Sequence, residues 1–380
     1  MEPIVIIGSG LAGYNAAREF RKLDPRTPLV IVSADGGEFY SKPTLSNALA
    51  AKKAPEQIPL NSAAQMAEQL KATVRPRTRV TALEPEQRRV RIGGEALPYS
   101  KLVLAIGAEQ IRLPLEGDAA GRVLSVNSLD DYARFRAALA AGSKVLIIGA
   151  GLIGCEFAND LAASGYPVDV VDIAEQPLPR LLPAAGAALL KEKLAALGVT
   201  WHLGASVKAV NGDGDAFNVA LTNGRSVAAG IVLSAVGLRP QLALAKNAGL
   251  KTNRGIVVNR HLESSVPGVY ALGDCAEVEG LVLPFVMPIM HAARALAATL
   301  AGKRTPVSYP AMPVLVKTPA CPTIVSPPAS GAGEWQAVSA AGGVKSLFRD
   351  ATGKLLGFAL NGSATAERAQ LVRELPPVLA

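Results

Sequence analysis

Two glycine motifs of the form G-x-G-x-x-G could each bind the pyrophosphate of a dinucleotide. One spans residues 8–13 and the other residues 149–154. In such a motif the first glycine makes a tight turn, the second lets the backbone approach the pyrophosphate, and the third lets a helix pack closely on a strand. The N-terminus of that helix attracts the anion. The glycines predicted to do this are Gly8, Gly10, Gly13, Gly149, Gly151 and Gly154.

An acidic residue follows each motif at about the distance where a ribose hydroxyl would be bound, roughly 20 residues further on. These residues are Asp35 and Asp172, and Glu38 competes with Asp35 as the ribose ligand of the first site. Asp172 would repel a 2′-phosphate, and Glu175 stands where an NADPH enzyme would place a cation. The second site is therefore expected to prefer NADH, unless Asp172 is a strand-end residue that faces solvent.

The elements that must position these residues repeat along the chain. Each motif follows a continuous apolar run typical of a buried parallel strand, and a helical pattern comes after it. A second apolar run then ends at the acidic residue. In the first copy these segments are Ile4–Ile7, Tyr14–Leu23 and Leu29–Asp35, and in the second they are Val145–Ile148, Cys155–Ser164 and Val168–Asp172.

Length and composition are those of a globular protein of more than one domain. The chain has 380 residues, of which 49% are hydrophobic and 18% are charged, and one core rarely serves so long a chain. No apolar stretch approaches the roughly 20 residues that span a bilayer. The first residues also lack the basic region of a secretory signal, so a cytoplasmic location is expected.

The cysteines and histidines indicate neither a dithiol redox site nor a metal site. Cys155, Cys275 and Cys321 stand far apart and form no C-x-x-C pair, which argues against a dithiol relay and against zinc. They are expected to be small core residues. The three histidines lack metal-ligand spacing, so no metal site is predicted.

The net charge of +8 could serve nucleic acid, a membrane surface or an acidic protein partner. The basic residues are scattered, however, and those within residues 75–91 alternate as the outer face of short strands would. Few aromatic residues are present to stack on single-stranded nucleic acid. Neither nucleic acid nor membrane insertion is therefore predicted, and an acidic protein partner remains open.

Three further segments resemble motifs of the pyridine nucleotide–disulfide oxidoreductase superfamily. They are Leu102–Ala108 with Gly107, Ile231–Pro240 with Gly237, and Val269–Cys275 with Gly273 and Asp274. The resemblance implies bound FAD and NADH, with Asp274 holding the ribityl chain of the flavin, a role that is compatible with a helix N-cap before Cys275–Glu277. Ile106 departs from the family pattern, in which threonine is usual at this position.

This resemblance implies an α/β fold with two Rossmann-like dinucleotide-binding domains and a small α+β C-terminal domain. The FAD domain would be discontinuous, covering residues 1–112 and 238–303, and the NADH domain would cover residues 113–237. The helical segment Pro288–Ala301 would close the FAD domain. A change to proline-rich sequence marks the C-terminal domain, residues 304–380, whose strand-like runs are Val344–Phe348 and Leu355–Leu360.

Within the superfamily, the sequence resembles the branch of ferredoxin and rubredoxin reductases. The redox cysteine pair is missing, and the segment Phe39–Ser46 is similar to the Y-x-[RK]-P-x-L-S stretch of that branch. Residues 154–160 and 316–322 resemble its rubredoxin-reducing members. The resemblance implies that a hydride passes from NADH to FAD and that single electrons pass from there to rubredoxin, a small acidic protein. Such two-to-one electron chemistry belongs to the flavin.

The resemblance also assigns roles to particular side chains. Lys42 would pair with Glu156 beside the flavin, although an inter-domain ion pair without a redox role would look the same. Lys317 would reach the flavin from the C-terminal domain, or it is an ordinary edge-strand lysine. Additional cofactor contacts are expected at Leu11, Ala12 and Val80.

Other functions stay open at this point. A ferredoxin or flavorubredoxin reductase shares nearly all of these motifs. An NADH oxidase or peroxidase is disfavoured because no cysteine lies near Tyr40. A redox-responsive binding flavoprotein, in which FAD and NADH drive a conformational change, is the alternative that is not an enzyme.

Overall fold

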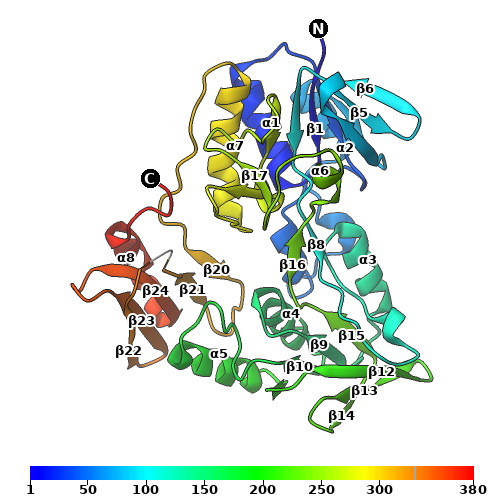
Figure 1. Cartoon of the computed structure of the whole chain (residues 1–380). Helices are drawn as coiled ribbons and strands as arrows, with labels where there is room; N and C mark the ends of the chain where they lie inside the picture. Colours follow the sequence, from blue (N-terminus) through cyan, green and yellow to red (C-terminus); the bar gives the residue numbers. More distant parts are fainter. Residues whose placement is uncertain (329–330) are drawn as a thin grey trace.

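In the computed structural model, which describes residues 1–328 and 331–380, three bodies surround a central region where they meet (Figure 1). The first body is formed by the beginning and the end of the segment 1–303, and the middle of that segment lies elsewhere. Its five-stranded parallel sheet has its apolar strand β1 in the middle, with Ile4 opposite Leu29 on one side and Lys101 on the other. In spatial order the strands are β18 (Val269–Ala271), β7 (Lys101–Leu104), β1 (Ile4–Ile7), β2 (Leu29–Val32) and β3 (Thr73–Arg75).

Helices and short strands cover this sheet. Helices α1 and α7 pack against each other, and the two lie side by side in Figure 1. An antiparallel sheet of three strands lies on the other side of β1 from these helices in Figure 1. The elements are α1 (Leu11–Leu23), α2 (Ala63–Leu70), α6 (Ala243–Asn247), α7 (Val286–Leu300), β4 (Val80–Glu84), β5 (Arg89–Ile92), β6 (Glu95–Pro98), and the parallel pair β17 (Ile256–Val258) and β19 (Ala276–Val278).

The second body repeats this plan. Its parallel sheet joins strands in the order β11-β10-β9-β15, and Val145 in β9 lies opposite Val168 in β10. A three-stranded antiparallel sheet covers one face and helices cover the other. The elements are β9 (Val145–Ile148), β10 (Val168–Asp172), β11 (Val199–Leu203), β15 (Ile231–Ser234), β12 (Val207–Asp213), β13 (Ala216–Leu221), β14 (Ser226–Ala229), α3 (Leu129–Ala138), α4 (Leu152–Ala163) and α5 (Ala184–Ala196).

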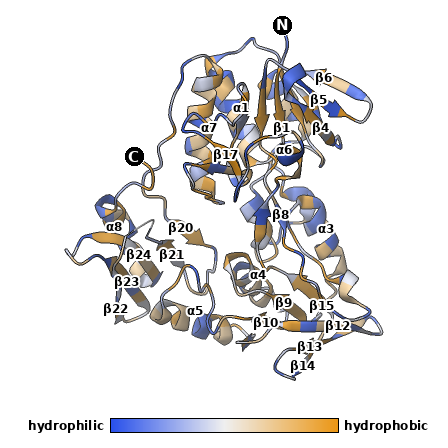
Figure 2. Cartoon of the chain, viewed as in Figure 1, coloured by the Kyte–Doolittle hydropathy of each residue, from blue (hydrophilic) through white to orange (hydrophobic). Residues whose placement is uncertain are grey.

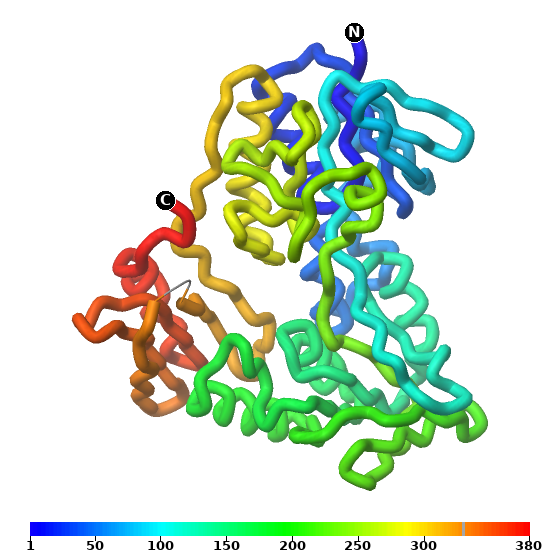
Figure 3. Tube along the Cα trace, in the orientation of Figure 1, coloured from blue at the N-terminus to red at the C-terminus, as the bar shows by residue number. Residues whose placement is uncertain are grey.

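Two strands carry the chain between these bodies. The chain leaves the first body through β8 (Ala108–Gln110) and returns through β16 (Leu238–Pro240), which pairs with β8 in antiparallel fashion. The tube in Figure 3 shows the cyan and yellow-green segments running together between the bodies. The first body is thus built from two stretches of sequence.

The third body follows α7. It is an antiparallel sheet in the order β20-β21-β24-β23-β22, and α5 of the second body packs on β23 and β24. An α+β unit was predicted here, and the predicted runs 344–348 and 355–360 lie within its central strands. The elements are β20 (Val314–Val316), β21 (Thr323–Ser326), β22 (Glu334–Ala340), β23 (Gly343–Arg349), β24 (Leu355–Gly362) and α8 (Arg368–Glu374).

The helices begin earlier than the apolar patterns predicted. α1 starts at Leu11 rather than Tyr14, and α4 starts at Leu152 rather than Cys155. The reason is that the third glycine of each motif lies inside its helix, where it permits close packing, and the second glycine is the N-cap. The fold class predicted from the sequence is confirmed.

Burial agrees with the sequence pattern. Figure 2 shows hydrophobic residues concentrated in the central strands β1, β9 and β15. All three cysteines are buried and free, which confirms their interpretation as core residues. Within residues 75–91, Arg75, Arg77, Arg89 and Arg91 pair with exposed or half-buried acids, for example Arg75 with Glu95 at 2.8 Å. None of the helices in the described ranges is long and apolar enough to cross a bilayer.

Candidate active site between the three bodies

The first glycine loop connects β1 to α1 and leaves room for a ligand at one position only. Gly8 has φ +112°, and a Cβ there would lie 2.2 Å from the carbonyl oxygen of Ala105. A Cβ on Gly13 would lie 1.9 Å from the oxygen of Gly8. In contrast, a Cβ on Gly10 would meet nothing within 4 Å. Gly10 is therefore the point where a pyrophosphate can approach the helix N-terminus.

The second loop, between β9 and α4, has the same geometry. Gly149 has φ +110°, and its Cβ would lie 2.7 Å from the oxygen of Ala235. A Cβ on Gly154 would lie 1.9 Å from the oxygen of Gly149, and Gly151 faces open space. The two loops thus fit two dinucleotides, as the repeat in the sequence predicted.

Asp35 lies against the first loop. Its Oδ1 accepts hydrogen bonds from the hydroxyl of Ser9 at 3.0 Å and from the main-chain N–H of Gly37 at 3.1 Å. Glu38 is close by, because a Cβ on Gly36 would lie 2.3 Å from its Oε1. Both carboxylates are therefore near the end of β2, where a ribose would lie, and the choice between them stays a prediction.

Asp172 braces the second loop. Its Oδ2 accepts from the N–H of Ala150 at 2.6 Å, and its Oδ1 accepts from Ala174 at 2.7 Å. Ala150 stands between the first two glycines of the motif. Asp172 therefore does not simply face solvent, and its position beside the loop suits a ribose hydroxyl as well.

The later motifs converge on the same region. A Cβ on Gly273 would lie 2.7 Å from the Cβ of Ala12, so this glycine allows the late motif to pack on α1. Gly107 has φ +69° and open space beside it. Val80 begins β4 and packs, half-buried, on the core of the first body, and its contact with the cofactor stays a prediction.

Asp274 has a carboxylate that suits a bound hydroxyl. It lies in the 3-10 turn Gly273–Cys275, and in the described ranges its side chain makes no hydrogen bond and caps no helix. The accompanying expectation of a helix N-cap is therefore wrong, because a strand follows this turn. Burial raises the pKa of Asp274, while the positive charge of Lys42 opposes this increase. A half-buried acceptor of this kind fits the polyol chain of a flavin.

Lys42 does not make the predicted ion pair with Glu156. It lies in the 3-10 helix Lys42–Ser46, and its Nζ donates to Oδ1 of Asn127 at 3.1 Å. Burial lowers the pKa of Lys42, and the charges of Asp274, Asp35 and Asp131 oppose this decrease. Lys42 and Asp274 are thus near enough for their charges to interact.

Glu156 pairs instead with Lys317 from the third body. The carboxylate is 2% exposed and accepts from Lys317 Nζ at 2.5 Å, from Lys317 N at 2.9 Å and from Ser46 Oγ at 2.6 Å. Three donors thus hold this carboxylate, and Lys42 binds Asn127 instead. The edge-strand interpretation of Lys317 is also wrong, because this residue follows β20 and points inward to α4.

Sequence reasoning missed Asn127 and the role of Ser46. The amide of Asn127 is oriented by its own donor, since Nδ2 donates to the oxygen of Ala108 at 2.9 Å. Its Oδ1 therefore faces Lys42. No motif marks Asn127, whereas Ser46 belongs to the family-like stretch 39–46 and could have been chosen there.

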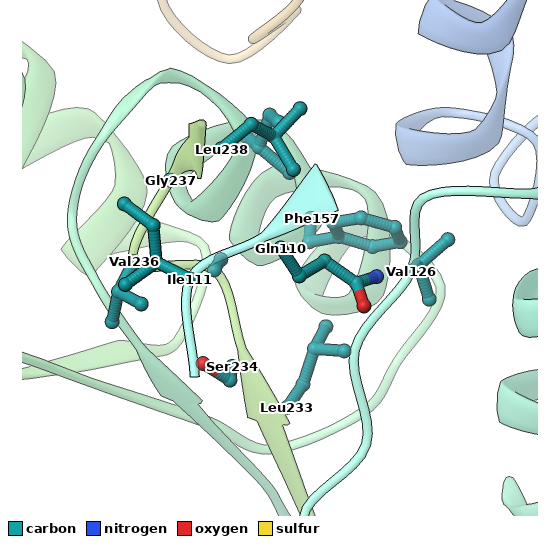
Figure 4. A pocket seen from close by; sticks show the side chains of 11 residues that line it. Gln110, Ile111, Val126, Phe157, Leu233, Ser234, Val236, Gly237 and Leu238 are labelled. Atoms are coloured by element: carbon teal, nitrogen blue, oxygen red, sulfur yellow. The ribbon is translucent and has the colours of Figure 1, made fainter. Parts of the chain in front are cut away.

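A mainly apolar cavity lies beside the second glycine motif (Figure 4). It includes Ile153 and Phe157 from α4 and Gly237 from the segment after β15. The side-chain nitrogen of Gln110 is buried there without a partner in the described ranges. The remaining lining residues are Ile111, Val126, Leu233, Ser234, Ala235, Val236 and Leu238. The cavity gives the second dinucleotide site an apolar wall with one amide group.

The sequence with these two dinucleotide loops, the acidic turn and the third body matches two family models. Residues 2–298 match the model described as pyridine nucleotide-disulphide oxidoreductase, and residues 306–375 match the model described as rubredoxin binding C-terminal domain. The chain belongs to the pyridine nucleotide-disulphide oxidoreductase family, whose members use FAD and NAD(H).

Particular relatives narrow this class. The chain is 49% identical to the rubredoxin-NAD(+) reductase of Alcanivorax borkumensis, over 100% of both chains. It is also 49% identical to the protein of that name from Acinetobacter baylyi, over 100% of this chain and 99% of the relative. Among solved structures, a ferredoxin reductase for the CYP199A2 system of Rhodopseudomonas palustris has a TM-score of 0.89, with 25% identity over 99% and 96% of the two chains.

Proposed function

We propose that this protein transfers electrons from NADH, through FAD, to rubredoxin. The observation that carries the proposal is the third body. It matches a rubredoxin-binding domain, and it places Lys317 against Glu156 of α4, two residues after the second glycine motif. The domain named for the acceptor thus contributes directly to the site.

The first body, residues 1–112 and 238–303, would hold FAD. Gly10 lets the pyrophosphate approach α1, Asp35 or Glu38 accepts from the ribose, and Asp274 accepts from the ribityl hydroxyls. When bound, FAD supplies the exchange between a two-electron donor and a one-electron acceptor. The protein's part is to hold this group and to exclude water from one side of it.

The second body, residues 113–237, would hold NADH. Gly151 admits the pyrophosphate, and Asp172 accepts from the adenosine ribose while repelling a 2′-phosphate. The apolar cavity beside Ile153 and Phe157 lies between this loop and the first body. It would orient the nicotinamide end toward the flavin site, where proximity converts a bimolecular step into an effectively unimolecular one.

Two lysines would set the electrostatics of the flavin site. Lys42 from the first body and Lys317 from the third body each bring positive charge, and fixed positive charge favours a flavin that has gained electrons. Glu156 would orient Lys317 rather than Lys42. It is held by Ser46, so that its carboxylate cannot turn away from the lysine.

The acceptor is expected to be steered by charge. A protein with net charge +8 attracts a small acidic partner such as rubredoxin, and salt should weaken that attraction. We also propose that residues 304–380 form the acceptor-binding domain. The cytoplasmic location predicted from the sequence is part of the same proposal.

The test is steady-state NADH oxidation by the FAD-containing protein with rubredoxin or a [2Fe–2S] ferredoxin as acceptor, at low and high salt. Fast, salt-sensitive reduction of rubredoxin and slow reduction of ferredoxin are expected. A preference for ferredoxin or for a flavorubredoxin would replace the acceptor in the proposal. Bound FAD without turnover on any acceptor would contradict an electron-transfer role.

A further inference from the structure

Helix α4 carries two buried polar side chains that the mechanism above does not use. Asn159 and Asp160 are each 3% exposed. They lie three and four residues after Glu156, so the three side chains share one face of the helix. Buried polar groups are costly unless they are hydrogen-bonded, and therefore the partners of this pair indicate what the pair does.

Asp160 binds the segment of the first body that carries Lys42. Its Oδ2 accepts from the main-chain N–H of Leu49 at 3.0 Å, and its Oδ1 accepts from that of Ala50 at 2.8 Å. These amides follow the 3-10 helix Lys42–Ser46 by only a few residues. Each carboxylate oxygen thus holds one amide of a segment more than 100 residues away in sequence.

Asn159 binds the segment of the third body that carries the other lysine. Its Oδ1 accepts from the N–H of Ala320 at 3.1 Å, three residues after Lys317. Glu156, one turn earlier, receives Lys317 and Ser46 from the same two segments. One face of α4 therefore binds both lysine-bearing segments twice, once at Glu156 and again one turn later at Asn159 and Asp160.

We propose that Asn159 and Asp160 are positioning residues, which hold the two lysine-bearing segments in register with the second body through main-chain amides. Neither residue touches the reacting groups. Their effect passes through the placement of Lys42 and Lys317, and displacements on the order of 1 Å can change rates strongly. This inference deepens the proposed function, since it rests on the lysines acting at the flavin.

The carboxylate of Asp160 is well suited to this task. Burial raises the pKa of Asp160, and the hydrogen bonds from Ala50 and Leu49 oppose that increase. The ionised form is the one that can accept two amides at once. An amide side chain in its place would keep one of the two acceptor oxygens and would turn an N–H group toward the other donor.

The test is Asp160→Asn in the FAD-containing protein. Flavin reduction by NADH is followed by loss of flavin absorbance in a stopped-flow instrument, with no acceptor present. We expect FAD to stay bound and the limiting rate of reduction to fall about tenfold, with little change in the NADH concentration for half-saturation. An unchanged limiting rate would overturn the proposal.

A matched control exists in the same body. Asp169 on β10 is also 3% exposed, but its partners His202 and Lys144 belong to the second body, at 2.6 and 2.7 Å. Asp169→Asn removes a buried charge without touching either lysine-bearing segment. The limiting rate of this variant should match the parent, and a similar fall would show that loss of a buried carboxylate in general slows reduction.

A double-mutant cycle separates positioning from general support. If Asp160 acts through Lys42, then Asp160→Asn should slow reduction much less in a Lys42→Met background than in the parent. The same tenfold loss in both backgrounds would overturn the proposal. If Asp160→Asn loses FAD on purification, the same cycle is made with Asn159→Leu and Lys317→Met. Asn159→Leu should then slow flavin reduction much less in the Lys317→Met background than in the parent. Because no acceptor takes part, these results stand apart from whether rubredoxin is the acceptor.

Discussion

Replacing Lys317 by methionine should destabilise the protein by leaving a buried carboxylate without its cation. Glu156 is 2% exposed, whereas the side chain of Lys317 is 27% exposed. Methionine has nearly the same length and keeps the apolar contacts of the lysine stem. The change therefore removes the charge and its hydrogen bonds while conserving volume.

The size of the effect follows from burial. Breaking a fully buried ion pair by removing one partner costs roughly 3–5 kcal/mol. Lys317 is partly exposed, and Glu156 keeps two donors, Ser46 Oγ and the main-chain N–H of residue 317. Both facts reduce the loss, so we expect about 2 kcal/mol, on the order of a thirtyfold increase in the unfolded fraction.

The measurement is urea unfolding at fixed protein and FAD concentrations, followed by circular dichroism and by flavin fluorescence. FAD concentration must be constant because bound ligand adds to the apparent stability. A change in the midpoint without a change in slope would show that stability itself has changed. The double variant Glu156→Gln, Lys317→Met has no unpaired charge and should recover to within about 1 kcal/mol of the parent.

Two results would refute this reasoning. If Lys317→Met is as stable as the parent, the ion pair contributes nothing and water replaces it freely. If the double variant is as unstable as Lys317→Met alone, the loss comes from packing around residue 317 rather than from the charge on Glu156.

Four further predictions concern the cofactor sites, pH and salt. Asp172→Ala should raise the Michaelis constant for NADH and weaken the preference over NADPH in steady-state assays, whereas equal losses for both would leave Asp172 as a brace of the loop only. Lys42→Met should slow flavin reduction or lower the flavin midpoint potential with FAD still bound, and a parent-like rate and potential would make Lys42 a structural cation. Burial and the charge of Arg294 lower the pKa of His291, so stability should be lost as pH falls below the unfolded-state pKa of about 6.5. Between pH 7 and pH 5, the melting temperature of His291→Gln should fall by less than that of the parent. An equal fall in both proteins would contradict this. Raising salt from about 50 to 300 mM should slow rubredoxin reduction while leaving acceptor-free flavin reduction by NADH unchanged, as expected for charge steering between proteins.

The sequence was sufficient for features that depend on short stretches of chain. The glycine loops were predicted correctly because each task, a tight turn, an open approach and a close helix contact, is local to six residues. The parallel strands were predicted because a buried strand is apolar along its whole length. The starts of α1 and α4 were misplaced, since the patterns were read from the residues after the third glycine.

The tertiary structure decided which side chains meet. Glu156 binds Lys317, which is 161 residues away in sequence, and Lys42 binds Asn127 instead. Both lysines suited Glu156 chemically, and the choice depends on how the third body docks on α5 and α4. The roles of Asn159 and Asp160 depend on the same docking. Periodicity and motif spacing determine elements and loops, but they do not determine how the three bodies are oriented, and the site lies where those bodies meet.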